Sequence, residues 1–150
     1  MDEASATTTE QALQPIRVGE HFGRTLRYTV EQIVAFAETS LDLNPLHQPD
    51  APDGPIASGQ HSAAIMMGLV ASHFSRDDDG VRREMLCLNF NFAFKAAVQA
   101  ERDIDMRWLV TSVEYNSRLG GWVGQLNGTA FSGGSDCVVA RGTVLVRRLD

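Results

Sequence analysis

Apolar residues recur along the chain with two different periods, and the change from one to the other falls after Arg83. Before this residue, two segments carry apolar side chains at the spacing of a helix face. After it, apolar and polar residues alternate, as they do in strands that bury one face. The alternating runs cover residues 86–94, 104–110, 120–131 and 137–147.

Another strand is expected near His21, so the predicted order is strand, helix, loop, helix and four consecutive strands. Clustered strands with little room for crossover helices favour an antiparallel sheet and an α+β fold. One small sheet leaves an edge exposed, and edge-to-edge pairing of two copies would cover it.

The two helical segments differ in how much of their surface is apolar. Thr29 followed by Gln32 is the pattern of a capping box and predicts an amphipathic helix at Val30–Thr39. The second helix is expected to begin at Gly59 or Gln60 and to end near Phe74. It has almost no polar face, which is typical of a helix enclosed by other elements, and a strongly curved sheet wrapped around it would bury it.

Residues 41–59 separate the two helices and contain four prolines, so they predict an ordered loop rather than a helix or strand. Residues 1–15 have no period and predict a mobile N-terminal tail. The remaining residues, 16–150, are expected to form a single domain.

Composition narrows the class of protein further. The chain has 150 residues, of which 43% are hydrophobic, and a net charge of -6 with no run of basic residues, which argues against a nucleic-acid partner. Its apolar segment at residues 63–71 falls short of the roughly 20 residues that a membrane span requires. The first 15 residues show no secretory or transit pattern, so we expect a cytoplasmic protein without membrane association.

Cys87 and Cys137 form no CxxC pair, and both fall inside strand patterns, so we expect two buried thiols and no metal site. The acidic run at residues 77–80 lacks the later ligands of a calcium loop and predicts a solvated turn.

His47 is the histidine with a chemically informative context. His21 and His73 have no carboxylate nearby in a constrained segment and are expected to be surface or packing residues. His47 lies five residues after Asp42, with Pro45 between them to stiffen the loop. Such a loop can hold a carboxylate and an imidazole toward one cleft, as a general acid and base pair requires. On these six residues alone, a turn capped by Asp42 with a half-buried His47 is the commoner outcome.

A second feature, Ile56-Ala57-Ser58-Gly59, opens directly onto the apolar helix. A glycine lets another molecule approach the backbone closely, and the free N–H groups of a first helical turn carry partial positive charge. This is a suitable site for a carbonyl oxygen that becomes negative during a reaction. A glycine needed only for the turn is an equally good interpretation of this feature alone.

Taken together, the two features resemble the MaoC-like dehydratases, the family that includes the (R)-specific enoyl-CoA hydratases. The matching stretches are residues 29–40, the motif Asp42-x-Asn44-Pro45-x-His47, and Ile56-Ala57-Ser58-Gly59-x-His61-x-Ala63-Ala64. The resemblance implies a hot-dog fold, in which an antiparallel sheet wraps around the helix at residues 60–74, and a homodimer with joined sheets.

The resemblance also implies a reaction and the residues that carry it. Asp42 and His47 would be the catalytic pair, activating a water for addition to a trans-2-enoyl thioester or, in reverse, dehydrating a 3-hydroxyacyl thioester. The backbone N–H of Gly59 would bind the thioester oxygen. Substrate binding or pocket shaping is expected from the flanking residues Asn44, Ser58, Gln60 and His61.

The expected substrate carrier is coenzyme A or an acyl carrier protein, and no cofactor or metal is expected, since the sequence has no phosphate-binding glycine loop and no metal-ligand spacing. The chain departs from the family in having Met67 where some relatives place a serine, and in a degraded hairpin motif at residues 97–102. Two alternatives stay open: a thioesterase on the same scaffold, and a non-catalytic thioester-binding subunit.

Overall fold

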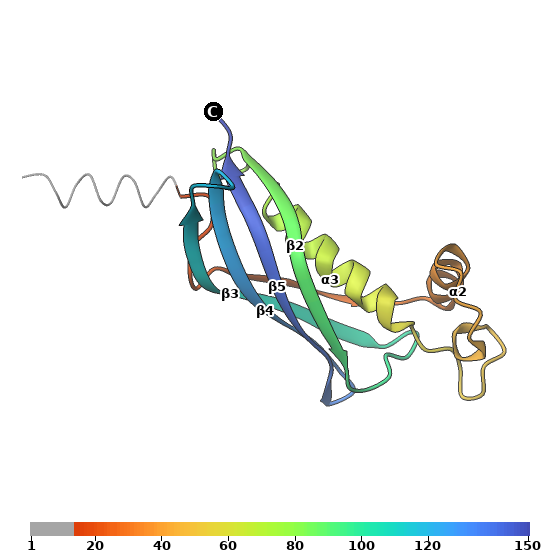
Figure 1. Cartoon of the computed structure of the whole chain (residues 1–150). Helices are drawn as coiled ribbons and strands as arrows, with labels where there is room; N and C mark the ends of the chain where they lie inside the picture. Colours follow the sequence, from red (N-terminus) through yellow and green to blue (C-terminus); the bar gives the residue numbers. More distant parts are fainter. Residues whose placement is uncertain (1–13) are drawn as a thin grey trace, which may run out of the picture.

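The computed structural model describes residues 14–150, which form one five-stranded antiparallel sheet with a long helix against its concave side (Figure 1). The predicted mobile segment falls mostly on residues 1–13, which lie outside the described residues. The strand order in the sheet is β1-β3-β4-β5-β2. The elements are β1 (His21–Arg27), α2 (Val30–Thr39), η1 (Pro45–His47), α3 (Gly59–His73), β2 (Arg83–Phe94), β3 (Asp103–Asn116), β4 (Gly121–Ser132) and β5 (Ser135–Arg148).

The predicted element order and the α+β class are confirmed. Helix α2 has the predicted bounds, and its capping box is complete: Thr29 Oγ1 accepts from the Gln32 N–H at 3.1 Å, and Gln32 Oε1 accepts from the Thr29 N–H at 3.0 Å. The prediction for the loop was wrong at Pro45–His47, where a short 3-10 helix forms. Asn44 caps this turn through its side chain, and the fixed φ of Pro45 suits a first helical position.

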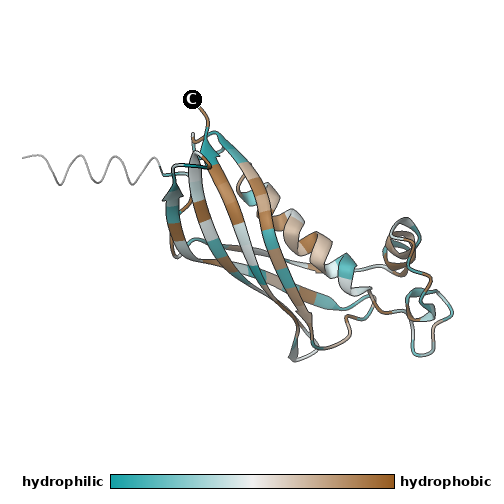
Figure 2. Ribbon diagram, in the orientation of Figure 1, coloured by the Kyte–Doolittle hydropathy of each residue, from teal (hydrophilic) through white to brown (hydrophobic). Residues whose placement is uncertain are grey.

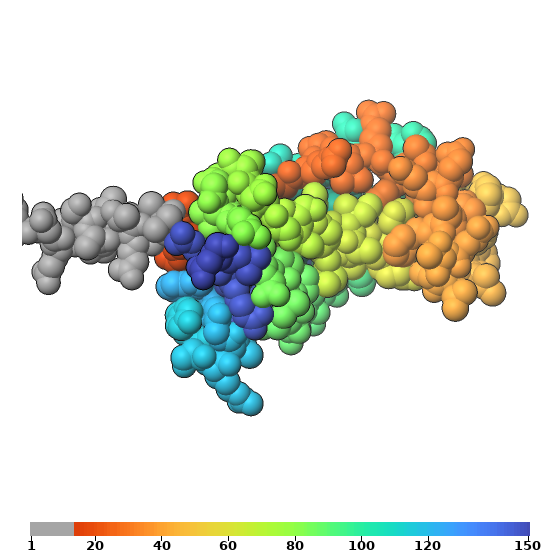
Figure 3. Space-filling model, turned by 90° about the horizontal axis from the view of Figure 1, so that it is seen from above, coloured from red at the N-terminus to blue at the C-terminus, as the bar shows by residue number. Residues whose placement is uncertain are grey.

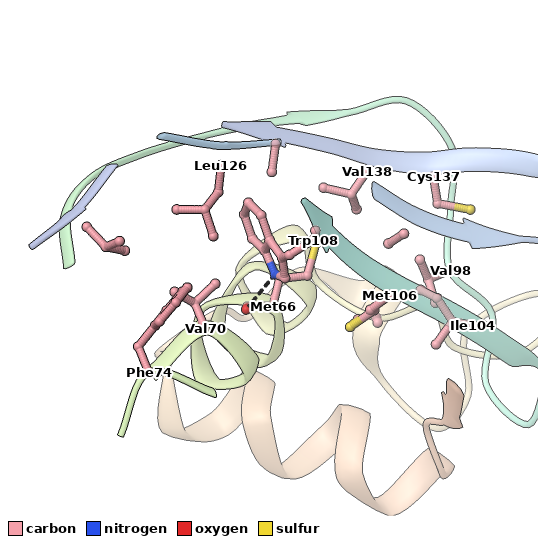
Figure 4. Close-up of a cluster of buried hydrophobic side chains, with 14 of the residues drawn as sticks. Met66, Val70, Phe74, Val98, Ile104, Met106, Trp108, Leu126, Cys137 and Val138 are labelled. Atoms are coloured by element: carbon pink, nitrogen blue, oxygen red, sulfur yellow. Dashed lines mark hydrogen bonds between the residues drawn. The ribbon is translucent and has the colours of Figure 1, made fainter. Parts of the chain in front are cut away.

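The hydrophobic core lies between α3 and the concave face of the sheet. Trp108 on β3 packs there almost fully buried, and its indole Nε1 donates a hydrogen bond to the Met66 carbonyl on α3 at 3.0 Å (Figure 4). This bond satisfies the polar atom of the ring and fixes the helix against the sheet. The buried apolar residues of α3 and of the strands line this interior. Figure 2 shows hydrophobic positions along both α3 and the strands.

Helix α3 is not enclosed on all sides within one chain, so that prediction was wrong. The sheet covers the side that carries Met66 and Val70, whereas Ala64, Gly68 and Ser72 are exposed. Figure 3 shows the side chains of α3 at the surface between β1 and β2. Five strands curve over one side of a helix, and the other side has no covering element in the described part of the chain.

An ionic network closes the far end of α3. Arg83 is buried, and its guanidinium binds the Asp79 carboxylate at 2.5 and 2.9 Å and also donates to backbone carbonyls, including that of Pro15. These bonds hold the pKa of Asp79 well below its usual value. The acidic run at 77–80 is thus tied to the body through Asp79. Nearby, His73 Nε2 lies 2.5 Å from Glu20 Oε2, while its ring stacks on Phe22.

The edge strand β2 exposes apolar residues. Leu86, Leu88 and Phe94 are about half exposed, and Cys87 between them is exposed as well. The prediction that both cysteines are buried was therefore wrong for Cys87 and confirmed for Cys137. A central strand such as β5 is covered by neighbours, whereas an edge strand is covered only if another element or chain adds to it.

Candidate active site

The site begins with a sharp reversal of the chain after α2. Leu41 adopts the left-handed conformation, with φ of 60°, and the Asp42 N–H donates to the Ala37 carbonyl at 2.8 Å. This arrangement terminates α2 and turns Asp42 back toward the body of the molecule. The 3-10 turn that follows then places His47 on the same side.

Asp42 and His47 are brought together. Asp42 Oδ2 lies 3.3 Å from His47 Nε2, and both side chains are largely shielded, with exposed fractions of 19% and 8%. The other ring nitrogen, Nδ1, lies 2.8 Å from the Ile56 carbonyl. Because a carbonyl can only accept, Nδ1 carries the hydrogen in this bond, and Nε2 is the nitrogen presented to Asp42.

Two donors hold the carboxylate of Asp42. The Asn44 N–H donates to Oδ1 at 3.0 Å, and Gln60 Nε2 donates to Oδ2 at 2.9 Å. Gln60 belongs to the first turn of α3, so this bond ties the loop to the start of the long helix. The carboxylate is therefore fixed from both of the elements that form the site.

The N-terminus of α3 is the second component. Ser58 caps the helix, its hydroxyl accepting from the His61 N–H at 3.3 Å. Among the described residues, the Gly59 N–H has no hydrogen-bond partner. A Cβ at position 59 would lie 3.0 Å from the ring of Phe94, so a larger residue here would have to displace that ring. The helix thus presents a free backbone donor, as expected for a first turn.

These groups meet at a cavity of about 390 Å³. His47 and Asn44 line it from the loop, Ser58 and Gly59 from the helix start, and the β2–β3 connection closes it from the other side. An antiparallel bridge between Ile56 and Gln99 holds that connection in place. Asp42 and Gln60 do not line the cavity but lie directly behind His47.

His61 is placed elsewhere. It lines a larger cavity of about 640 Å³ between β1, α2 and α3, which shares no lining residue with the one at His47. The larger of the two cavities is therefore not the one beside the Asp42–His47 pair. We assign the chemistry to the smaller cavity, because His47 and a free backbone donor line it and the carboxylate of Asp42 lies beside His47.

Sequence reasoning missed three contributors to this site: the Ile56 carbonyl that orients His47, the amide of Gln60 as the partner of Asp42, and the Phe94 ring over Gly59. The first two partners are separated from their targets by 9 and 18 residues across a loop, and no periodic pattern connects them. Of the three, only the contact with Phe94 left a signal in the sequence, namely the glycine at position 59, because glycine permits a close approach.

No protein-family model matches the chain, and no curated protein matches it in sequence. Solved structures do match. The (R)-hydratase from A. caviae involved in PHA biosynthesis is similar over 86% of this chain and 96% of its own, with a TM-score of 0.71 and 24% identity. The chain has a hot-dog fold.

The hot-dog chain also resembles the MaoC-like dehydratase from Rhodospirillum rubrum, with a TM-score of 0.69 and 20% identity over 90% of this chain and 95% of that one. A fluoroacetyl-CoA-specific thioesterase matches with a TM-score of 0.61 and 16% identity, over 89% of this chain and 97% of that one. The hot-dog fold implied by the sequence resemblance is confirmed, and structural matches to MaoC-like dehydratases and (R)-hydratases extend across most of the chain. One fold hosts several activities, so the fold alone does not determine the reaction.

In the described part of the chain, no helix has the length and apolar character needed to cross a membrane. Within residues 14–150, no group of three or more histidine, cysteine, aspartate or glutamate side chains is positioned to hold a metal ion.

Proposed function

We propose that this hot-dog protein adds water to trans-2-enoyl thioesters or, in the reverse direction, dehydrates 3-hydroxyacyl thioesters. The observation that carries the proposal is that His47 and the free N–H of Gly59 line one cavity, with the carboxylate of Asp42 beside His47. A carboxylate and an imidazole 3.3 Å apart can contact a single water molecule, and the helix N-terminus can bind the oxygen of the acyl group.

The chemistry assigns a separate role to each group. Asp42 and His47 hold the water and take its proton as its oxygen attacks Cβ, and the proton delivered to Cα comes from the same pair. Charge moves onto the thioester oxygen as the enolate forms, and the Gly59 N–H stabilises it. In the dehydration direction the same groups remove the Cα proton and protonate the leaving hydroxyl. Every step is a proton transfer or an addition, so this route uses no redox cofactor.

Three residues support this arrangement. Asn44 and Gln60 hold the carboxylate of Asp42 by the bonds described above, and we assign them this positioning role. Ser58 caps the helix and lines the cavity. His61, expected to shape the pocket, lines the larger cavity instead, and only its neighbour Ser62 lines the catalytic one.

We expect the carrier to be coenzyme A or an acyl carrier protein, and the protein to act in the cytoplasm. Lys95 lines the cavity and is exposed, so it offers a positive charge to a phosphorylated carrier at the entrance.

The hot-dog fold also serves a thioesterase, which hydrolyses the acyl thioester instead of hydrating its double bond. The two activities leave different products. Hydration removes the absorbance of the conjugated enoyl thioester without releasing a thiol, whereas hydrolysis releases free thiol that a thiol reagent detects.

A panel of trans-2-enoyl-CoA substrates of increasing chain length tests the proposal. We expect loss of enoyl absorbance, no free thiol, and a 3-hydroxyacyl-CoA product. Thiol release at the rate of substrate loss would establish the thioesterase instead. A purified, folded protein that changes none of the substrates, on either carrier, would leave the non-catalytic subunit as the correct interpretation.

A further inference from the structure

The larger cavity, between β1, α2 and α3, has no role in the proposed reaction. Its volume of about 640 Å³ is within the range of small-molecule sites. In Figure 3 it lies where the orange residues of β1 and α2 meet the yellow-green residues of α3. We call it the β1–α2–α3 groove. It shares no lining residue with the cavity at His47.

The walls of this groove are mainly apolar. Leu26 of β1 lines it, and α3 contributes Ile65 and Leu69 one turn apart. These three side chains are only partly buried although they pack against the core. From α2 come Ala35 and Phe36. The apolar lining suits a hydrocarbon chain.

The charge at the groove is positive in a chain whose net charge is -6. Arg24 and Arg27 line it, and none of its lining residues is acidic. Arg27 is paired with Asp103, whereas the side chain of Arg24 forms no hydrogen bond or ion pair with any residue in the range 14–150. The acidic residues of α2, Glu31 and Glu38, line a different hollow of the surface. An unpaired guanidinium beside an apolar wall is a suitable partner for a carboxylate.

His61 supplies an independent observation. Its residue surface is only 6% exposed, and its ring stacks on Phe36 at 4.4 Å and packs against Tyr28 at 4.6 Å. Its Nδ1 atom is buried without a hydrogen-bond partner among the described residues. Burial lowers the pKa of His61, so the ring is neutral near pH 7. Buried polar atoms normally have a hydrogen-bond partner. The neighbouring Tyr28 hydroxyl has one, Ser62 Oγ at 3.0 Å, whereas His61 Nδ1 has none among the described residues.

We propose that the β1–α2–α3 groove binds a medium-chain carboxylic acid that carries an oxygen substituent far from its carboxylate. The carboxylate pairs with Arg24, the chain lies on Leu26, Ile65 and Leu69, and the distal oxygen bonds the imidazole of His61. Arg24 on β1 and Tyr28, which follows β1 and contacts His61, are four residues apart, about 13 Å of extended backbone. A chain of that length is required to reach both polar groups.

Isothermal titration of the full chain with three probes tests the head and the tail of this ligand separately. The probes are decanoate, decylammonium, which has the same tail with the opposite charge, and 10-hydroxydecanoate. We expect 10-hydroxydecanoate to bind at one site, decanoate about tenfold more weakly, and decylammonium more weakly still. Equal binding of decanoate and decylammonium, or no saturable binding of either acid, would overturn the proposal.

Two variants assign the contacts. Arg24→Gln should weaken both acids about tenfold and leave decylammonium unchanged, whereas the same change at the exposed Arg141, which does not line the groove, should change neither acid. His61→Phe keeps the stacking and should abolish the preference for 10-hydroxydecanoate over decanoate. Unchanged acid affinity in Arg24→Gln, or a preserved preference in His61→Phe, contradicts the assignment.

Amide chemical shifts locate the bound acid. We expect 10-hydroxydecanoate to perturb Leu26, Ile65 and Leu69, whereas perturbation confined to Gly59, Val98 and their neighbours would place it in the catalytic cavity and refute the proposal. No turnover is measured in any arm, so this result and the outcome of the hydration assay are independent.

Discussion

Neighbouring groups hold the carboxylate of Asp42 in a fixed position. It accepts from Asn44 and Gln60, and its Oδ2 atom lies beside His47 Nε2. The histidine in turn is oriented by a backbone carbonyl. A pair held on both sides in this way is preorganised for proton transfer, because neither side chain has to be ordered when the substrate arrives.

Asp42→Asn and His47→Ala should each lower kcat by a factor of about 100 to 10,000, which is the usual contribution of a positioned acid or base. Both residues lie in the segment between α2 and α3, outside the core, so the midpoint of thermal unfolding should change little. Asp50→Asn, an exposed residue of the same loop, is the matched control and should keep normal turnover. Near-normal kcat in either active-site variant would contradict the mechanism.

Gln60→Met should lower kcat about tenfold with little change in KM, because it removes a donor to Asp42 without touching the cavity. Steady-state kinetics on an enoyl thioester measure the two constants separately. Gln48→Met makes the same replacement in the adjoining loop and should behave as the unmodified protein. A rise in KM alone would show that Gln60 contacts substrate instead of positioning the carboxylate.

At the scale of elements, the start and the end of α3 are held by different means. Its N-terminus is capped by Ser58 and kept open at Gly59, whereas its C-terminal end is held by side chains from β1, β2 and the following turn. His73 had no carboxylate nearby in sequence, yet Glu20 lies beside it, because the antiparallel packing brings together residues 53 positions apart.

Gly59→Ala should lower kcat/KM about tenfold, since the new Cβ meets the Phe94 ring at 3.0 Å and displaces it at the cavity. Gly68→Ala is the same change in the same helix, with nothing within 4 Å of the added Cβ. The control should keep its activity and raise the free energy of unfolding by about 0.5–1 kcal/mol, because alanine has less conformational freedom to lose. Equal effects of the two substitutions on kcat/KM would argue against a special role for position 59.

Arg83→Ala should lower the free energy of unfolding by about 3–5 kcal/mol, because it leaves buried carbonyls and the Asp79 carboxylate without their partner. Urea unfolding measures this loss. Arg82→Ala changes the neighbouring, exposed arginine and should cost far less.

The pH dependence of the same contact has a defined sign. Arg83 lowers the pKa of folded Asp79, so the stabilisation is present above the ordinary pKa of an aspartate and is lost as pH falls toward the folded value. Asp79→Asn should therefore be less stable than the unmodified chain at neutral pH, with the difference shrinking in acid. A difference that is constant between pH 7 and pH 3 would contradict this account.

At the scale of the whole molecule, one chain leaves apolar surface uncovered. The exposed apolar residues of β2 and the exposed side of α3 adjoin each other along one flank. We expect two copies to join their sheets along β2, which would bury Leu86, Cys87 and Leu88.

Leu88→Glu should convert a dimer to a monomer, because it places a charge in that joint. Light scattering after size exclusion should give about twice the chain mass of 16.4 kDa for the unmodified protein and the chain mass itself for the variant. Leu109→Glu, on β3 and exposed to the same degree, should remain a dimer. A monomeric unmodified protein would refute the joint along β2.

Apart from the short 3-10 helix at Pro45–His47, the sequence by itself determined the elements, their order and the fold class, because these follow from local periodicity, caps and turns. Val30–Thr39 is bounded by its capping box, and the strands follow from alternation. It also singled out Asp42, His47 and Gly59, since a rigid loop and a helix start carry their own short signatures.

Only the tertiary structure decided which partners these residues meet. The bonds from Gln60 to Asp42 and from Ile56 to His47, the contact of Phe94 with Gly59, and the placement of His61 in a second groove all depend on packing between distant segments. Exposure was decided in the same way: Cys87 and α3 have the pattern of buried elements, but burial depends on what covers a surface. Periodicity records which face of an element is apolar, whereas the neighbour that lies against that face is a property of the assembled fold.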